Sequence, residues 1–247
     1  MTGGVKDGRL FAYVNSDIDS FGFDSRTYSD ISLNGRYEDK NVSFDLVSFD
    51  PKARMAMSGG GDFSEKGTPR YDFDMNAQRM KLHRLNVQPD STAWLSLAAH
   101  GSGIGKDLDG LNGRVNIEDV EYVLESDTVR IGDINISALN GVEQKSLTLD
   151  SRLFSFDYRG GLNYKQAVQG VKECAYEFFP TLAPENYVMT GVGNDVPVTA
   201  TLRFRNINEF LAMAFDNVNV SDGTTLRVDM NNEKGELLSL SAPYADY

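Results

Sequence analysis

The chain has 247 residues, 40% of them hydrophobic, and a formal net charge of −12 from 24 Lys and Arg against 36 Asp and Glu. This length allows one large β domain or two average domains. The acidic balance argues against nucleic acid or an anionic membrane surface as a partner, because both attract cationic side chains. The single cysteine, Cys174, excludes an intrachain disulfide without identifying the compartment.

No run of about 18 apolar residues occurs, so no membrane span is expected within the chain. The opening residues, MTGGVKDGRL, lack the apolar segment of a signal peptide. If the protein is exported to a cell envelope, we therefore expect this chain to be a middle portion of a longer protein.

Alternating apolar residues predict strands from residue 8 to about residue 87. Leu10–Val14 is apolar on both faces of such a strand. Ile31 and Leu33 precede Asn34-Gly35, a pair that is typical of a tight hairpin turn. Residues 76–87 are expected to form a short helical turn.

The stretch 41–63 carries the clearest pattern. Apolar residues alternate over Val42–Leu46, stop at Asp50-Pro51, resume over Ala53–Met57 and end at Gly59–Gly61. This pattern predicts two half-buried antiparallel strands that are joined by a turn and ended by glycines. Another alternating strand is expected over Tyr71–Met75.

The same design returns later in the chain. Leu147–Leu149, Asp150-Ser151, Phe154–Tyr158 and Gly160-Gly161 form a second copy, and Leu238–Pro243 begins another. We therefore expect one continuous β-rich repeat array with approximate units 8–90, 91–190 and 191–247, the last one truncated.

Between these copies, Trp94–Ala99 predicts a strand and the glycine-rich residues 101–105 predict a loop. Three further strands are expected around three pairs of apolar residues: Val115 and Ile117, Val129 and Ile131, and Ile134 and Ile136.

Two helices are expected in the C-terminal half. Apolar residues from Tyr164 to Phe178, including Ala167, Val168 and Cys174, follow helical spacing, and Pro180 stops the pattern. Val198–Phe204 predicts a strand. After this strand, Asn206 with Glu209 favours a capping box for a short helix.

No catalytic constellation is found. His83 and His100 are the only histidines, and neither lies in a nucleophile motif. Residues 101–106 lack the spacing and the hydroxyl of a phosphate-binding loop. The stretch from Asp107 to Glu118 lacks an oxygen ligand and the glycine of a calcium loop. We therefore expect a non-enzymatic protein without cofactor or metal.

A β-rich array with one apolar face has two ordinary outcomes. Two sheets can pack face to face and seal their apolar faces into a core. Alternatively, one sheet can curl into a trough whose apolar inner face stays accessible to a ligand. The alternation itself is compatible with both.

One succession of features runs along the chain: Leu33-Asn-Gly35, Val42–Leu46, Asp50-Pro51, Ala53–Met57, Gly59, Asp62-Phe63 and Tyr71–Met75. It recurs over Leu147–Tyr164. This succession resembles the repeats of TamB and AsmA-like envelope proteins. The resemblance covers most of the chain. It implies a mainly β fold, an elongated and curled antiparallel sheet of the β-taco type with one or two short helices.

The resemblance also implies a periplasmic protein that is anchored in the inner membrane through a segment not present here. Members of the family are implicated in phospholipid transport between the inner and outer membranes, and TamB also in outer-membrane protein assembly. The expected ligand is a phospholipid or another acyl chain held in an apolar groove. The groove candidates are the alternating apolar residues Phe44, Leu46, Met55, Met57, Phe73, Met75, Leu95, Leu97, Leu147, Leu149, Phe154, Phe156, Leu202 and Phe204.

Two other functions fit the same pattern. The sheet edge can pair with a strand of an outer-membrane client, which would make the protein an assembly scaffold. A closed β-sandwich can instead serve as an adhesion or carbohydrate-binding module, with exposed aromatic residues such as Trp94 or Tyr122 in contact with the ligand.

Overall fold

The fold is mainly β. The computed structural model describes residues 1–23, 26–64, 68–82, 92–141, 144–178, 184, 187–188, 196–214, 219–231 and 235–243. The strands of this part of the chain are joined in one open antiparallel sheet whose order follows the sequence from β1 to β14, and two short α-helices accompany it. The predicted fold class, an antiparallel sheet with one or two short helices, is confirmed.

The chain divides into two compact units. Unit 1 comprises Met1–Leu108 and Asn112–Ile134, and unit 2 comprises Asp109–Leu111 and Asn135–Tyr247. The predicted repeat boundaries near residues 90 and 190 fall in stretches outside the described residues, so the three-unit repeat division stays a prediction.

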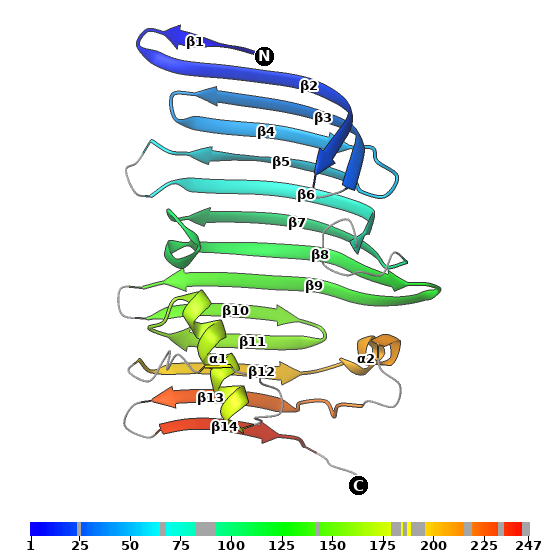
Figure 1. Cartoon of the computed structure of the whole chain (residues 1–247), viewed down its shortest axis with the longest axis vertical. Helices are drawn as coiled ribbons and strands as arrows, with labels where there is room; N and C mark the ends of the chain where they lie inside the picture. The colour runs from blue at the N-terminus through cyan, green and yellow to red at the C-terminus, as the bar shows by residue number, and fades with distance from the viewer. Residues whose placement is uncertain are drawn as a thin grey trace. The chain divides into compact units, whose positions relative to one another are not determined.

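Unit 1 contains the first eight strands and the beginning of the ninth (Figure 1). Their bounds are β1 Thr2–Lys6, β2 Arg9–Phe23, β3 Arg26–Glu38, β4 Asn41–Ser48, β5 Arg54–Asp62, β6 Arg70–Lys81, β7 Trp94–Ile104, β8 Asn112–Leu124 and β9 Asp127–Asn140.

The predicted hairpin of residues 41–63 is confirmed as β4 and β5, which pair from Asn41–Asp62 to Ser48–Met55. Asp50 builds the turn between them. Its Oδ1 accepts a hydrogen bond from the Lys52 amide at 2.8 Å, and its Oδ2 accepts one from the Ser29 amide at 3.2 Å. A buried carboxylate that accepts two backbone hydrogen bonds in this way fixes the chain path into β5.

The predicted turn at Asn34-Gly35 is wrong, because both residues lie inside β3 and pair with Asn15 and Val14. The hairpin turn lies five residues later, at Asp39 and Lys40, whose φ angles are 47° and 69°. Two consecutive positive φ angles form the type I′ turn that suits a two-residue connection between twisted strands.

Several predicted strand ends are also wrong. Gly59–Gly61 lie within β5, and Gly101–Gly103 lie within β7. Residues 76–81 continue β6 instead of forming a helical turn, and the rest of that predicted turn falls largely outside the described residues. The two strands expected over residues 129–136 are one strand, β9, in which Gly132 adopts a φ of +74°.

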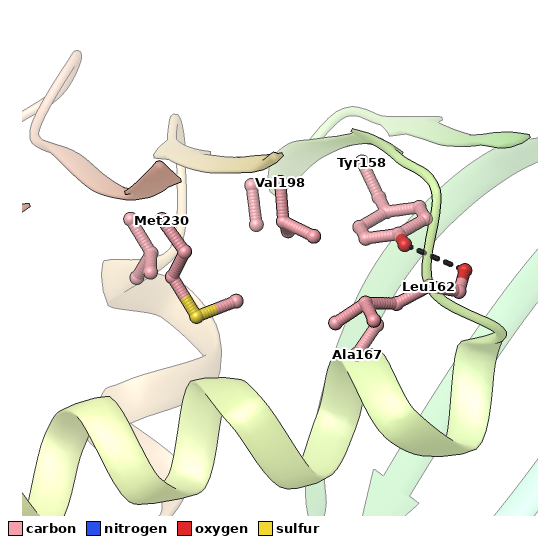
Figure 2. Close-up of a cluster of buried hydrophobic side chains, with 7 residues drawn as sticks. Tyr158, Leu162, Ala167, Val198 and Met230 are labelled. Carbon is pink, nitrogen blue, oxygen red and sulfur yellow. Dashed lines mark hydrogen bonds between the residues drawn. The ribbon is translucent and has the colours of Figure 1, made fainter. Parts of the chain in front are cut away.

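Unit 2 continues the sheet and contains the helices. Their bounds are β10 Lys145–Ser151, β11 Phe154–Gly160, α1 Tyr164–Phe178, β12 Val198–Phe204, α2 Asn208–Ala214, β13 Thr225–Asn231 and β14 Gly235–Ser241. The predicted long helix is confirmed as α1. A cluster of buried residues lies between α1 and the sheet (Figure 2).

Candidate functional site

The predicted groove residues of β4–β7 lie on one face of unit 1. In an antiparallel ladder, residues that pair directly across strands share a face. The pairing therefore places one row of apolar side chains across six strands: Leu33, Leu46, Met57, Met75, Ala99 and Ile117. We call the surface that contains this row the apolar face of unit 1.

A second row on this face alternates large and small residues. It runs through Val14, Gly35, Phe44, Gly59, Phe73, Gly101 and Val115. The phenylalanine rings lie over their glycine neighbours, since a Cβ atom on Gly59 would stand 3.1 Å from Cε1 of Phe44 and one on Gly101 would stand 2.8 Å from Cζ of Phe73. Because glycine has no Cβ atom, both rings can pack directly against the backbone of the neighbouring strand.

At one end of β5–β7, the apolar face borders a cluster of buried residues. Met55, Ala77 and Leu97 pair across β5–β7, followed by Met80 with Leu95 after a bulge in β6. Ala77 and Met80 are buried, as are neighbouring apolar residues at this end, namely Ala53, Leu82, Ala93, Val120 and Tyr122. The candidates Leu95 and Leu97 therefore border a packed region.

The opposite face of the same strands is polar. One cross-strand row there consists of Asn34, Asp45, Ser58, Asp74, His100 and Asn116. His100 lies inside β7 instead of at a strand end, with its Nε2 3.0 Å from Nδ2 of Asn116. His83 lies outside the described residues. Unit 1 is thus an amphipathic sheet.

All fourteen groove candidates are half-buried. They are neither sealed, like Ala77 or Met230, nor exposed, like Leu240. The described part of unit 1 contains no α-helix that could cover its apolar face.

Unit 2 also gathers its candidates on one face, but there a helix covers part of it. One row consists of Leu147, Tyr158, Ala200, Val228 and Leu238, and the next consists of Leu149, Phe156, Leu202, Leu226 and Leu240. Phe154 pairs with Phe204 at the strand end. The first row belongs to, or packs against, the buried cluster that also contains Ala167 of α1.

Hydrogen bonds hold α1 on this face. The Tyr158 hydroxyl donates to the Leu162 carbonyl at 2.9 Å, as Figure 2 shows. The Tyr164 hydroxyl donates to the Ser146 carbonyl at 3.2 Å, and the Tyr164 amide donates to Oδ1 of Asp109 at 3.0 Å. The start of the helix is therefore fixed to β10 and to the segment before β8.

Tyr158 gives unit 2 a pH dependence that can be measured. Burial raises the pKa of its hydroxyl to about 12, against about 10 in an unfolded chain. This contribution to stability is complete below about pH 10, and it is lost as the pH rises to about 12, because only the unfolded chain releases the proton there. We expect urea unfolding of unit 2 to lose up to about 3 kcal/mol across this window.

The matched variant for this measurement is Tyr158→Phe, which keeps the ring and removes the ionisable group. Its stability should be lower at neutral pH and should fall less steeply than that of the parent protein from about pH 10 to about pH 12, because the half-buried hydroxyl of Tyr164, whose pKa is also raised, remains. Hydrogen exchange of β10–β12 peptides assigns the change to unit 2. A variant as pH-sensitive as the parent protein would contradict the assignment to Tyr158.

Sequence reasoning missed several residues of the apolar face, among them Leu33, Tyr71, Val115 and Ile117. The period-2 signal was present at all four. Leu33 directly precedes the expected turn at Asn34-Gly35, so the local pattern does not reveal that it pairs with Leu46. Tyr122, expected to be exposed in a binding module, is buried.

In the part of the chain that the structure describes, no helix is both long and apolar enough to cross a bilayer. Comparison of the chain with models of protein families, with curated proteins and with solved structures found no match.

Proposed function

We propose that this chain is a non-catalytic, lipid-handling β segment of a TamB/AsmA-like envelope protein, and that acyl chains of phospholipids lie along the apolar face of unit 1. The observation that carries the proposal is the row from Leu33 to Ile117, which is apolar at every position and half-buried at every position except Ala99, which is buried. A face of this kind presents a continuous apolar surface, and the described residues of unit 1 form no α-helix that could lie over it.

The dimensions of the face suit an acyl chain. Neighbouring strands lie about 4.8 Å apart, so a row across six strands spans roughly 24 Å. One lipid tail occupies about 15 Å of a bilayer that is about 30 Å thick. Exposing a tail of about 16 carbons to water costs roughly 13 kcal/mol, at about 0.8 kcal/mol per methylene. Contact with this row offsets part of that cost.

The side chains of the row also suit an acyl chain. Met57 and Met75 are unbranched and adapt to irregular partners. Phe44 and Phe73 lie flat over glycines and keep the surface level beside them. The polar row of the other face keeps that side of the sheet in water. These features support movement of tails along the sheet in an aqueous periplasm, which is the location that the resemblance implies.

The test is a pair of charges on the row. In Leu46→Asp with Met75→Asp, we expect binding of a fluorescently labelled phosphatidylethanolamine to weaken by about tenfold or more, because each carboxylate would have to lose water beneath the tail. The matched control is Val47→Asp with Asn76→Asp. These residues are the next ones along the same two strands and therefore point to the opposite face.

Fluorescence titration measures the binding, and native mass spectrometry of the purified protein reports phospholipid that was carried through purification. Circular dichroism identifies a variant that fails to fold, and Leu46→Ser with Met75→Ser then replaces the charged pair. Folded face variants that bind as tightly as the control would refute the proposal.

The assembly scaffold is the second candidate, and β14 favours it. This strand ends the sheet order, and its Leu237 and Leu240 are 55% and 71% exposed. An exposed apolar edge strand is a template for pairing with another strand. The lipid titration separates the two functions, since strand pairing at β14 does not involve Leu46 or Met75.

A further inference from the structure

A pocket of about 1050 Å³ lies at the N-terminal edge of unit 1, and its lining contains no residue of the two rows described on the apolar face. It is lined by residues of β1–β4 and by the turns that join β1 to β2 and β3 to β4. Its aromatic residues, Phe11 and Tyr13, pair with Glu38 and Arg36. They therefore belong to the polar face, opposite Ala12 and Val14.

Two aromatic rings form the floor of the pocket. The ring centroids of Phe11 and Tyr13 are 5.6 Å apart and the rings are tilted by 44°. Tyr13 is 39% exposed, and the guanidinium of Arg36 lies 5.6 Å from its ring centroid. These two neighbouring rings, although tilted, together present an apolar area about the size of one or two sugar rings.

Polar groups are fixed around this floor. Nε of Arg36 donates to Oε2 of Glu38 at 3.0 Å, and its Nη2 donates to the same oxygen. Oε1 of Glu38 keeps its capacity to accept a hydrogen bond from a ligand. Nδ2 of Asn41 donates to the Asp39 carbonyl at 3.2 Å, and Nη1 of Arg9 lies 3.3 Å from Oδ2 of Asp39. These side chains place both hydrogen-bond donors and acceptors around the two rings.

The charges of the pocket balance. Its lining contains three cationic side chains, Lys6, Arg9 and Arg36, and three carboxylates, Asp7, Glu38 and Asp39. A lining without net charge gives neither a phosphate nor an ammonium group a long-range advantage. It offers donors and acceptors in similar number, which suits hydroxyl groups because each hydroxyl both donates and accepts.

We propose that this pocket binds a neutral saccharide. A pyranose ring has an apolar face of C–H groups and a rim of hydroxyls. The apolar face would lie on Phe11 and Tyr13, and the hydroxyls would bond to Arg36, Glu38 and Asn41. A pocket with an apolar floor and a few fixed polar groups is the usual form of a small-molecule site. Glycans of a cell surface or of a glycolipid headgroup share this chemistry.

The test uses maltotriose, cellotriose and chitotriose as probes, with glucose 6-phosphate as a charged comparator. Saturation-transfer difference NMR detects binding and shows which sugar protons lie against aromatic rings. We expect at least one trisaccharide to bind with a Kd on the order of 1 mM or tighter. Tyr13→Ala should weaken it by about tenfold, because the stacking ring is lost.

Phe21→Ala is the matched control. Phe21 is also an exposed aromatic residue of β2, but it lies outside the pocket, and the variant should bind like the parent protein. If Tyr13→Ala fails to fold, Tyr13→Leu keeps apolar area without a ring, and Asn41→Ala removes one hydrogen-bonding partner. Either of these should weaken binding by several-fold.

Three results would overturn the proposal. The first is that none of the three trisaccharides binds at a concentration about tenfold above the expected Kd. The second is that the folded pocket variants bind as tightly as the parent protein. The third is that glucose 6-phosphate binds at least as tightly as every trisaccharide. A glycolipid source is distinguished from a free glycan by repeating the titration with a soluble short-chain glucosyl lipid. Tighter binding of that lipid identifies the glycolipid, and equal binding identifies the free glycan.

Discussion

Replacing Ala167 with glutamate is expected to lower the free energy of unfolding of unit 2 by about 3 kcal/mol or more. Ala167 is 6% exposed and belongs to the cluster between α1 and the sheet. Figure 2 shows it on the helix face directed toward Leu162 and Tyr158. A carboxylate there has apolar neighbours, so it must either stay protonated or displace the helix.

The matched control is the next residue of the same helix. Val168 was predicted to belong to the apolar face of α1, but it is 57% exposed, so that part of the helical pattern is wrong. Val168→Glu is expected to change stability by less than about 0.5 kcal/mol, as is usual for surface substitutions. The two variants carry the same added charge one residue apart, and only the buried one should be destabilised.

Urea unfolding gives the stability, and hydrogen exchange of α1 peptides shows whether the helix has left the sheet. We expect faster exchange in α1 and increased binding of an apolar dye to Ala167→Glu, because the row from Leu147 to Leu238 would become accessible. Similar stabilities of Ala167→Glu and Val168→Glu would contradict the packing described for α1.

The role of α1 bears directly on the proposed function. Units 1 and 2 both present an apolar row, and among the described helices one packs on the row of unit 2, where Tyr158, Ala200 and Val228 are buried. In unit 2 the apolar residues of α1 occupy the position that an acyl chain would take in unit 1. If the proposal is correct, Ala167→Glu should therefore increase the amount of labelled lipid bound while lowering stability.

Local pattern was sufficient for much of the fold. In β4 and β5 the alternation, the Asp50 turn and the pairing agree, since apolar residues at every second position have one face to bury. The helical spacing of Tyr164–Phe178 likewise matches α1. In these segments the structure follows from residues that are close together in sequence.

Long-range contacts explain the parts that could not be predicted. Gly59 and Gly101 were expected to end strands, but rings of the neighbouring strand cover them, and no local pattern reveals which strand that is. Bulges in β6 and β8 shift the pairing beside Leu95, so its partners could not be counted from the alternation. The cover that α1 provides is likewise a tertiary contact. The face of each candidate was predictable, but its degree of shielding was not.

The glycines of the second row give the other large expected effect. At Gly35, Gly59 and Gly101, no positive φ requires glycine, so only the space beside the missing Cβ decides the cost of alanine. At Gly59 a Cβ would stand 2.6 Å from the Asp72 carbonyl oxygen and 3.1 Å from the Phe44 ring. Backbone of the neighbouring strand cannot move away without disturbing the ladder, so Gly59→Ala is expected to destabilise unit 1 by about 1–3 kcal/mol.

The same row contains its own controls. At Gly35 the nearest atom to a new Cβ is Cβ of Val14 at 3.8 Å, an ordinary contact. Gly35→Ala should therefore stabilise unit 1 by about 0.5–1 kcal/mol, because alanine loses less conformational freedom on folding. At Gly101 the obstacle is the Phe73 ring, a side chain that can rotate away. We expect Gly101→Ala to cost less than Gly59→Ala.

Urea unfolding of the three variants should rank them in the order Gly35→Ala, Gly101→Ala, Gly59→Ala, from most to least stable. The lipid titration adds an independent result at Gly101. In Gly101→Ala the displaced Phe73 ring would project from the apolar face. Lipid binding should therefore weaken by more than the loss of stability alone would explain. Phe73→Leu combined with Gly101→Ala removes the ring and should restore both the stability of unit 1 and its lipid binding. If Gly35→Ala were the least stable of the three, close packing of rings on glycine would not be the reason that this row needs glycine.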